Sequence, residues 1–300
     1  MEPIQDKKDI FKGLNKIYDW WVKNQFIASF YQGSNYMNWG YWNERTLNIK
    51  DACDNQVDTL VGFIPKKNGN ILEVACGAGG VTKRLFNFYS PPSITAINIS
   101  DFQLRKAADY APGCTFLLMD ATELSFTDNS FNNIISVEAA FHFNTREKFL
   151  KEAYRVLKRD GKLVMSDILF SPSSFSKITG KGSLSHHRSG KNNAISSRNN
   201  NATSKDSTAF GRSLGNHFNS LEEYKQLFID AGFRSEDIVV EDVTKATWPK
   251  YISAMKKSIS GFSKGSITKR VWCHIYWLYF FVYFEYIQPV DKYVLVSAGK

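Results

Sequence analysis

Residues 71–80 read Ile71-Leu72-Glu73-Val74-Ala75-Cys76-Gly77-Ala78-Gly79-Gly80. The apolar residues around Glu73 predict a short buried strand, and the small residues after it predict a tight loop that opens a helix at about 80–89. Glycines let such a loop pass close to a ligand, because they carry no side chain and tolerate positive φ. The free N–H groups of the next helix then face that ligand. Any strand-to-helix turn of an α/β protein shares this pattern, so the rest of the chain must decide between a turn and a ligand site.

The residues around the glycines indicate which kind of nucleotide-type cofactor this geometry suits, and a dinucleotide is the first to consider. A dinucleotide site carries Gly-x-Gly-x-x-Gly or Ala, and its third position falls here on Thr82. That mismatch disfavours a dinucleotide oxidoreductase. Glu73 stands four residues before Gly77, where a carboxylate can accept hydrogen bonds from an ammonium group or a water molecule.

Strand and helix patterns alternate along the chain. Apolar and β-branched runs predict further strands at 94–99, 115–119, 134–137, 162–166, 237–243 and 293–297. Helical spacing predicts helices at 10–30, 52–64, 103–110, 146–157, 220–231 and 249–258. The alternation predicts an α/β fold with a mostly parallel sheet of seven strands and helices on both of its faces.

Polar residues end or follow five of the predicted strands. They are Glu73, Asn98, Asp120, Glu138 and Asp167. Ligands of parallel sheets bind beyond the carboxyl ends of the strands, so we expect these five residues at one edge and near one site.

Four segments, in this order, resemble the signatures of class I S-adenosylmethionine (SAM)-dependent methyltransferases. They are residues 73–79, 96–103, 119–121 and 155–161. Residues 138–143, Glu-Ala-Ala-Phe-His-Phe, resemble more narrowly the members that methylate small molecules such as natural products, sterols, tocopherols and amines. The resemblance covers about 10–170 and 215–299. It implies a Rossmann-like fold, methyltransferase activity and S-adenosyl-L-methionine as cofactor.

The resemblance assigns cofactor contacts to the first segment. It implies that Gly77 and Gly79 lie against the cofactor and that Glu73 lies near its amino-acid end. The usual pattern has glycine where this chain has Ala75, which is the mildest departure from it.

The next two segments supply the remaining implied contacts. Asn98 is expected to meet the ribose hydroxyls in place of the usual acid, because an amide both donates and accepts hydrogen bonds. Ile99 and Gln103 are expected to flank the adenine and the ribose. Asp120 is expected to accept from the adenine amino group, with the N–H of Ala121 beside it.

His142 and Asp167 are the expected catalytic residues. His142 follows the fourth strand, and the ordinary pKa of histidine suits a base near neutral pH. Asp167 follows the fifth strand and is expected to orient or assist His142, whereas Glu138 is expected to contact the cofactor. O-methylation is therefore the first hypothesis. The alternatives are C- or N-methylation of a prenyl, sterol-like or amine acceptor, a non-catalytic subunit, and a structural role for His142.

The chain divides into four expected parts. Residues 1–50 resemble the helical lid of small-molecule methyltransferases, although their aromatic loop at 36–42 could instead cap the sheet edge. Residues 51–170 are the expected SAM-binding core. Residues 171–212 are a low-complexity stretch of Ser, Asn, Lys and Gly, expected to be a flexible insertion. Residues 213–300 are expected to complete the same domain.

The charge of the chain constrains its partners. The net charge is +9, but 171–205 and 243–284 carry thirteen basic residues and no acid, so the remainder is slightly acidic. We therefore expect no nucleic-acid partner, and a weak membrane-surface contact of the basic and aromatic C-terminal third is a second hypothesis. Residues 271–284 are too few to span a bilayer, and we expect a buried helix that walls an apolar pocket.

The remaining expectations concern the setting of the protein. The four cysteines have no metal-ligand spacing and fit free thiols in a reducing compartment, so we expect a cytoplasmic protein without a metal. Aromatic residues make up 15% of the chain, which favours an apolar or aromatic small-molecule acceptor. A monomer or a homodimer is expected.

Overall fold

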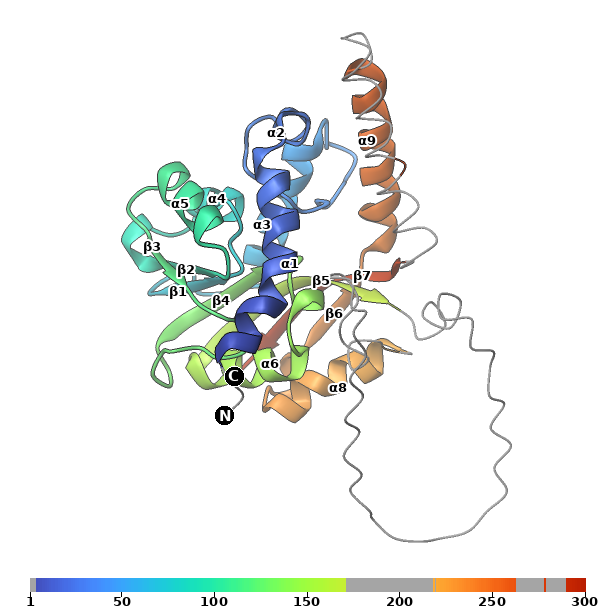
Figure 1. Cartoon of the computed structure of the whole chain (residues 1–300). Helices are drawn as coiled ribbons and strands as arrows, with labels where there is room; N and C mark the ends of the chain where they lie inside the picture. The colour runs from blue at the N-terminus through green and yellow to red at the C-terminus, as the bar shows by residue number, and fades with distance from the viewer. Residues whose placement is uncertain (1–3, 171–217, 219, 263–277, 279–289) are drawn as a thin grey trace, which may run out of the picture.

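One sheet forms the framework of the protein (Figure 1). The computed structural model describes residues 4–170, 218, 220–262, 278 and 290–300. Within these residues the sheet has the strand order β3-β2-β1-β4-β5-β7-β6. Its strands are β1 (Ile71–Val74), β2 (Ile94–Asn98), β3 (Thr115–Leu118), β4 (Phe131–Val137), β5 (Leu157–Phe170), β6 (Val239–Asp242) and β7 (Val290–Gly299). The predicted α/β fold with a seven-stranded sheet is confirmed.

The first five strands run parallel, which brings their carboxyl ends to one edge. Val74 at the end of β1 pairs with Ile97 of β2 on one side and with Ser136 of β4 on the other. β7 is antiparallel to both of its neighbours, β5 and β6. The sheet is thus mostly parallel, as predicted.

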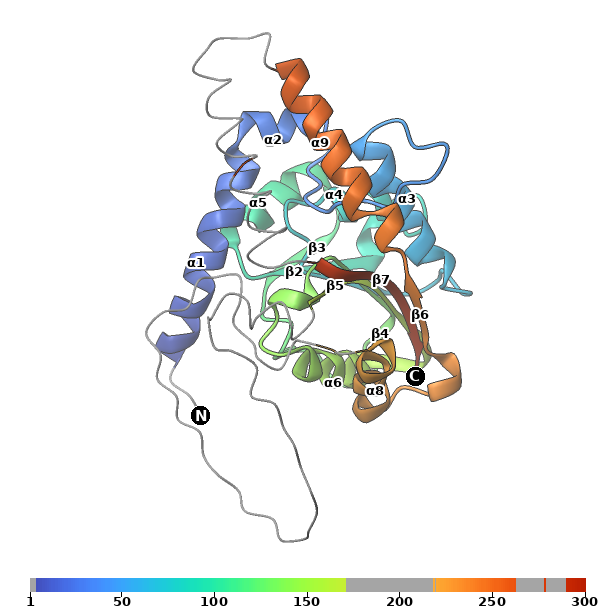
Figure 2. The same cartoon turned by 90° about the vertical axis from the view of Figure 1, so that its right-hand side faces the viewer.

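Helices cover both faces of the sheet (Figures 1 and 2). The described helices are α1 (Ile4–Lys23), α2 (Gln25–Phe30), α3 (Ile49–Gly62), α4 (Gly80–Leu85), α5 (Asp101–Tyr110), α6 (Arg146–Val156), α8 (Leu221–Ala231) and α9 (Trp248–Phe262). Successive strand residues point to opposite faces. Ile71 and Ile135 accordingly pack in the core under α3, whereas Leu72 and Ile134 pack in the core under α6 and α8.

The N-terminal helix is interrupted where one long helix was predicted. Asn24 ends α1, and its side chain caps α2 by accepting from the N–H groups of Phe26 at 2.9 Å and Ile27 at 3.2 Å. Asparagine favours such caps because its short side chain competes with helical backbone hydrogen bonds. The break turns the chain between α1 and α2.

The fifth strand is longer than predicted. α6 ends at Val156, and β5 runs through Lys162–Ser166 and on to Phe170. Its pairing with β7 extends from Lys162 to Phe170, so the neighbouring strand keeps this segment extended. Asp167 consequently lies inside a strand rather than after one.

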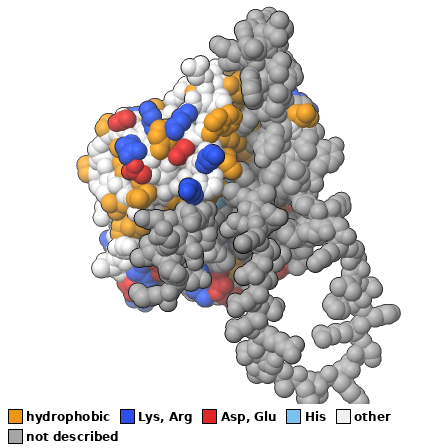
Figure 3. All heavy atoms as spheres, in the orientation of Figure 1, with side chains coloured by type: hydrophobic (Ala, Val, Ile, Leu, Met, Phe, Trp, Pro, Cys, Tyr) orange, Lys and Arg blue, Asp and Glu red, His pale blue; other side chains and the backbone are white. Residues whose placement is uncertain are grey.

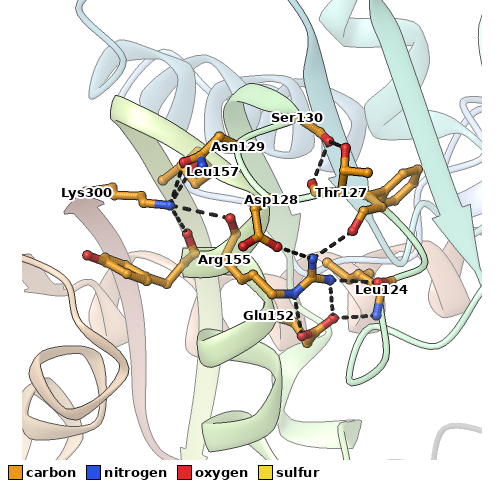
Figure 4. A network of polar contacts seen from close by, with 11 residues as sticks. Leu124, Thr127, Asp128, Asn129, Ser130, Glu152, Arg155, Leu157 and Lys300 are labelled. Carbon is orange, nitrogen blue, oxygen red and sulfur yellow. Dashed lines mark hydrogen bonds and ion pairs between the residues drawn. The ribbon is translucent and has the colours of Figure 1, made fainter.

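Arg155 fixes the segment that leads into β4 (Figure 4). Its guanidinium donates to the carbonyl oxygens of Leu124 and Phe126, each at 2.7 Å, and pairs with Asp128 at 2.9 Å and Glu152 at 2.8 Å. The segment 155–161, one of the four signatures, thus begins with a residue that anchors this loop to α6.

Two sequence predictions fall outside the described residues. They are the insertion at 171–212 and, apart from Leu278, the helix at 271–284. Among the helices that the structure does describe, none is both long and apolar enough to cross a membrane.

Charges of both signs share the visible surface. Figure 3 shows Lys and Arg side chains interspersed with Asp and Glu over the side that carries α4 and α5. Pairs such as Arg84 with Asp58 and Arg105 with Asp101 contribute to this mixture. The pattern on that side is typical of an ordinary solvated surface.

Candidate functional site

A cavity lies beyond the carboxyl ends of β1 to β4. Its empty space is about 1010 Å³ when the part that is open to solvent is included. Its lining includes Asn98, Asp120 and Glu138 at the strand ends and the loop at 75–77. Helix α1 and the loop at 35–38 supply further lining residues.

The glycine loop curves tightly below this cavity. Ala75 and Gly77 have φ values of 62° and 55°, so Ala75 occupies the left-handed region that glycine adopts more readily. Gly77 lines the cavity, and a Cβ there would meet the Met37 methyl group at 2.4 Å. Gly79 is placed differently: a Cβ at Gly79 would lie 2.9 Å from the Cα of Ala107, so this glycine lets α4 approach α5 and is not among the described lining residues.

Glu73 lies under the glycine loop and is only 2% exposed. Neither carboxylate oxygen has a hydrogen-bond partner among the described residues. Burial raises the pKa of Glu73 to about 8, and Thr82 at the start of α4 opposes part of that rise. Thr82 is thus near Glu73 but not at hydrogen-bond geometry, and such a buried carboxyl group is uncommon in folded proteins. Glu73 is not among the described lining residues of the cavity.

Asn98 belongs to a chain of hydrogen bonds that reaches the lid. Its amide donates to Gln103 Oε1 at 3.0 Å, and the Gln103 amide donates to Asp19 on α1 at 2.8 Å. Ser100 also donates to Asp19, at 2.7 Å, and the Asn15 amide donates to the carbonyl of Ile99 at 2.9 Å. Asn98, Ile99 and Gln103 all line the cavity, as expected, and α1 holds them in place.

Asp120 and Ala121 line the cavity beyond β3. Oδ1 of Asp120 accepts from the N–H and the hydroxyl of Thr122, both at 2.9 Å. Within the described residues Oδ2 accepts no hydrogen bond and can receive one from a ligand. The geometry therefore suits the expected contact to an amino group.

Glu138 is the first residue after β4 and lines the cavity. Its Oε2 accepts from the Trp39 N–H at 2.9 Å and from the Tyr293 hydroxyl at 2.6 Å. Burial of the carboxyl group raises the pKa of Glu138 to about 8, although these two donors act in the opposite direction. The contact to Trp39 attaches the aromatic loop at 36–42 to the sheet.

His142 faces the lid across the cavity. The Tyr18 hydroxyl of α1 lies 2.7 Å from Nε2 of His142, in the short helical turn η2 (Ala140–His142). Desolvation and the positive charge of Arg146 lower the pKa of His142 to about 3. The imidazole is therefore neutral at physiological pH and can accept a hydrogen bond or a proton, although as a weak base.

The structure corrects the predicted partner of His142. Asp167 is fully buried and is absent from the described cavity lining. Its carboxylate accepts from Arg146 Nε at 2.6 Å, from the Tyr224 hydroxyl at 3.0 Å and from the Ile168 N–H at 2.9 Å. These donors engage both of its oxygens, so Asp167 holds Arg146 and does not serve as the assistant of His142.

The sequence assigned residues 1–50 to a lid by resemblance but named none of them as site residues. Phe11, Leu14, Asn15 and Met37 from this part of the chain line the cavity. Tyr36 also lines the cavity, but its hydroxyl donates to Asp54 at 2.6 Å and is therefore not free to hold a cofactor carboxylate.

Comparison with known proteins shows which family and which structures this chain resembles. Residues 72–165 match the family model described as "Methyltransferase domain". This part of the chain is similar to a methyltransferase domain. The matched residues run from β1 to β5 and include Asn98, Asp120, Glu138 and His142.

Curated relatives of this methyltransferase domain act on small molecules. The 27-O-demethylrifamycin SV methyltransferase of Amycolatopsis mediterranei is 30% identical over 45% of this chain and 52% of the relative. The 2-methyl-6-phytyl-1,4-hydroquinone methyltransferase of a Synechocystis species is 32% identical over 50% of this chain and 49% of the relative. The chain thus spans about half the length of the curated relatives it matches.

A solved structure shares the fold across nearly the whole chain. The crystal structure of the cyclase SpnF matches with a TM-score of 0.66 and 19% sequence identity, over 96% of this chain and 95% of that one. At this identity the likeness shows the fold alone.

The methyltransferase domain has an acidic cavity. Asp120 and Glu138 are acidic lining residues, and no Lys or Arg occurs among the described residues of the lining. The rest of the lining is apolar, aromatic or neutral and polar. Such a surface favours cationic or neutral ligands over anions.

Proposed function

We propose that this protein is an enzyme that transfers a methyl group from S-adenosyl-L-methionine to a small-molecule acceptor, with an acceptor oxygen as the first choice. The observation that carries the proposal is the row of polar groups along the edge of the sheet. Asp120, Asn98 and Gly77 follow one another beyond β3, β2 and β1 and open into one cavity.

The residues present fit this cofactor. Glu73 precedes the glycine loop, and its buried carboxyl group has no donor at hydrogen-bond geometry among the described residues. Oδ2 of Asp120 is open to accept from the adenine amino group, and Asn98 can hold ribose hydroxyls. Gly77 lines the cavity and carries no side chain of its own that would keep a ligand away from its backbone. Together these groups match an adenosyl amino acid from one end to the other.

The chemistry asks mainly for alignment. When bound, the cofactor supplies a methyl group on a sulfonium, which is already a good leaving group. The protein contributes by holding the acceptor in line, which can lower a barrier by about 7–11 kcal/mol when two reactants are well oriented. We propose that His142 and Tyr18 orient the acceptor hydroxyl and that neutral His142 receives its proton.

The lining and the relatives support an apolar acceptor. Phe11, Leu14, Met37 and Phe143 are apolar residues of the cavity lining. The names of the two relatives refer to a demethylrifamycin and to a phytyl hydroquinone. An apolar or aromatic metabolite is therefore our proposed acceptor class.

C-methylation is the second candidate, and one observation favours it. The lowered pKa of His142 makes it a weak base for an alcohol, whereas a carbon nucleophile needs a base only after methyl transfer. A proton spectrum of the product separates an O-methyl from a C-methyl group directly.

We propose the same four-part organisation that the sequence indicated. Residues 1–50 act as lid, 51–170 bind the cofactor, 171–212 form an insertion and 213–300 complete the domain. Unpaired Cys53, Cys76 and Cys114 support a cytoplasmic location. We further infer a monomer or homodimer, with a membrane-surface contact of the basic C-terminal third as the alternative.

Calorimetric titration tests the proposal. The purified chain is titrated with S-adenosylhomocysteine, with NADH as control, and is then assayed for methyl transfer to a panel of hydroxylated and prenylated acceptors. Binding of S-adenosylhomocysteine alone, followed by turnover, supports the proposal. Absence of binding contradicts it, and binding without transfer to any acceptor favours a non-catalytic subunit.

A further inference from the structure

Glu138 occupies a defined end of the cavity. The sheet order β3-β2-β1-β4 places Asp120, Asn98, the glycine loop and Glu138 in sequence along one edge. Ser136 pairs with Val74, so Glu138 follows β4 beside the loop that leaves β1. If the adenine lies at Asp120, as proposed, Glu138 lies at the opposite end, where the amino acid and the reacting sulfur belong.

One oxygen of Glu138 is fixed and the other is available. Oε2 accepts both described hydrogen bonds, from the Trp39 N–H and the Tyr293 hydroxyl. Oε1 accepts none among the described residues, although Glu138 lines the cavity. The backbone of Glu138 has a φ of 53°, and its N–H donates to the Ser166 carbonyl at 3.0 Å. A strained non-glycine backbone held in this way is characteristic of functional positions.

The surroundings of Glu138 do not neutralise its charge. The uncharged groups that interact with it include Trp39, Tyr293, Tyr31, Tyr251 and Cys53. Asp167 raises the pKa of Glu138 further, and Asp167 itself is paired with Arg146. Among the described residues, no cationic side chain pairs with Glu138. A positively charged group of a ligand in the cavity can therefore pair with it.

We propose that Glu138 is an anionic subsite for the positive charge at the reacting centre, so that the cavity holds the sulfonium form of the cofactor more tightly than the demethylated product. The inference rests on the proposed function and extends it. Transfer of the methyl group breaks the sulfur–carbon bond and leaves a neutral thioether. The attraction to Glu138 is then lost, which favours release of the product.

The test compares two ligands that differ at this centre. Sinefungin carries a protonated amine where the cofactor carries its sulfonium methyl group, whereas S-adenosylhomocysteine is uncharged there. Both share the adenosine and the amino-acid end. We expect the full wild-type chain to bind sinefungin more tightly, by about tenfold or more, as judged by calorimetry.

Two glutamine variants separate the inference from a general loss of binding. Glu138→Gln should remove most of the sinefungin preference and change S-adenosylhomocysteine affinity by no more than about threefold. Glu73→Gln is the matched control, since Glu73 is expected to face the ammonium that both ligands carry, and it should weaken both equally. Glu138→Asp, which keeps the charge, should retain part of the preference.

The pH dependence of ligand binding by the wild-type chain tests the inference without any substitution. Since the pKa of Glu138 is about 8 in the empty cavity, the ratio of sinefungin to S-adenosylhomocysteine affinity should rise with pH between about 6 and 8, by up to about tenfold per unit. A ratio that is flat with pH and unchanged in Glu138→Gln would overturn this inference alone. If neither ligand binds the wild-type chain, the proposed function fails, and the inference fails with it.

Discussion

The Tyr18 hydroxyl and Nε2 of His142 lie 2.7 Å apart, although 124 positions separate them in the chain. Their rings also meet nearly at right angles, with centroids 5.4 Å apart. Tyr18 belongs to α1 and His142 to η2 beyond β4, so this pair joins the lid to the edge of the sheet. The contact attaches α1 to the segment that carries the candidate base.

Removal of either side chain should slow methyl transfer. His142→Ala should lower kcat by about 10²–10⁴, because it removes the proposed proton acceptor. Tyr18→Phe removes one hydrogen bond and should cost about tenfold or less. Steady-state kinetics on an identified acceptor, with S-adenosylhomocysteine affinity measured in parallel, checks both. Leu118→Ala on the exposed surface is the control and should leave kcat unchanged. Wild-type turnover of His142→Ala would contradict the assignment.

Asp167→Asn should unfold the protein more easily rather than disable a base. The Arg146–Asp167 pair is almost wholly buried, and loss of one partner from such a pair costs about 3–5 kcal/mol. Chemical denaturation should show this loss in the free energy of unfolding. Glu147→Gln breaks the exposed pair with Lys151 and should change stability by less than about 1 kcal/mol. A stable Asp167→Asn protein without activity would restore a catalytic role for Asp167.

Two substitutions in the glycine loop should act in opposite directions. Ala75→Gly removes the strain of a non-glycine residue at positive φ, but it also raises the conformational entropy of the unfolded chain. We therefore expect the free energy of unfolding to rise by at most about 1 kcal/mol. Gly79→Ala should destabilise by about 1–3 kcal/mol, since its φ is 90° and the new Cβ meets the backbone of Ala107. Thermal and urea unfolding of both variants measure the difference. Equal effects of the two changes would show that the loop adjusts freely.

Glu73 should make the ligand-free protein less stable as the pH rises. Its folded pKa of about 8 lies above the ordinary value of 4.5, so the folded state holds a proton that the unfolded state releases. Stability is then greatest below pH 4.5 for this group and falls as pH rises toward 8, by up to about 1.4 kcal/mol per unit.

Denaturation of the ligand-free protein at several pH values measures this slope. Glu73→Gln mimics the protonated group and should reduce the slope between about pH 5 and 8, while Glu138, whose pKa is also about 8, keeps its own contribution. An identical slope in wild type and variant would mean that Glu73 is ionised in the folded protein.

Asp19→Ala should weaken cofactor binding although Asp19 is absent from the described lining. Asp19 accepts hydrogen bonds from Ser100 and Gln103, which hold the segment after β2. Loss of two bonds of about 1 kcal/mol each predicts a tenfold or greater loss of S-adenosylhomocysteine affinity. Calorimetry checks this value, with exposed Asp109→Asn on α5 as control. Unchanged affinity would show that α1 does not position Gln103.

Local sequence patterns were sufficient to predict which residues at the strand ends line the cavity. Asn98, Asp120 and Glu138 could be placed together before the structure was known, because parallel strands share one carboxyl edge and each residue ends or follows a strand. The lid could not be placed in this way. Asn15, Asp19 and Tyr18 lie on an amphipathic helix, and helical spacing indicates which side chains share a face without indicating what that face meets.

The sequence by itself determined the fold class, the number of strands and the edge that carries the polar residues, since hydrophobic period and glycine placement act over a few residues. Only the tertiary structure decided the partners of the polar side chains. Pairing with β7 extends β5 to Phe170, so Asp167 lies within the strand and points with Met165 and Leu169 toward the core under α6 and α8, where Arg146 and Tyr224 hold it. His142 meets Tyr18 instead, because contacts between distant segments depend on packing that no local pattern contains.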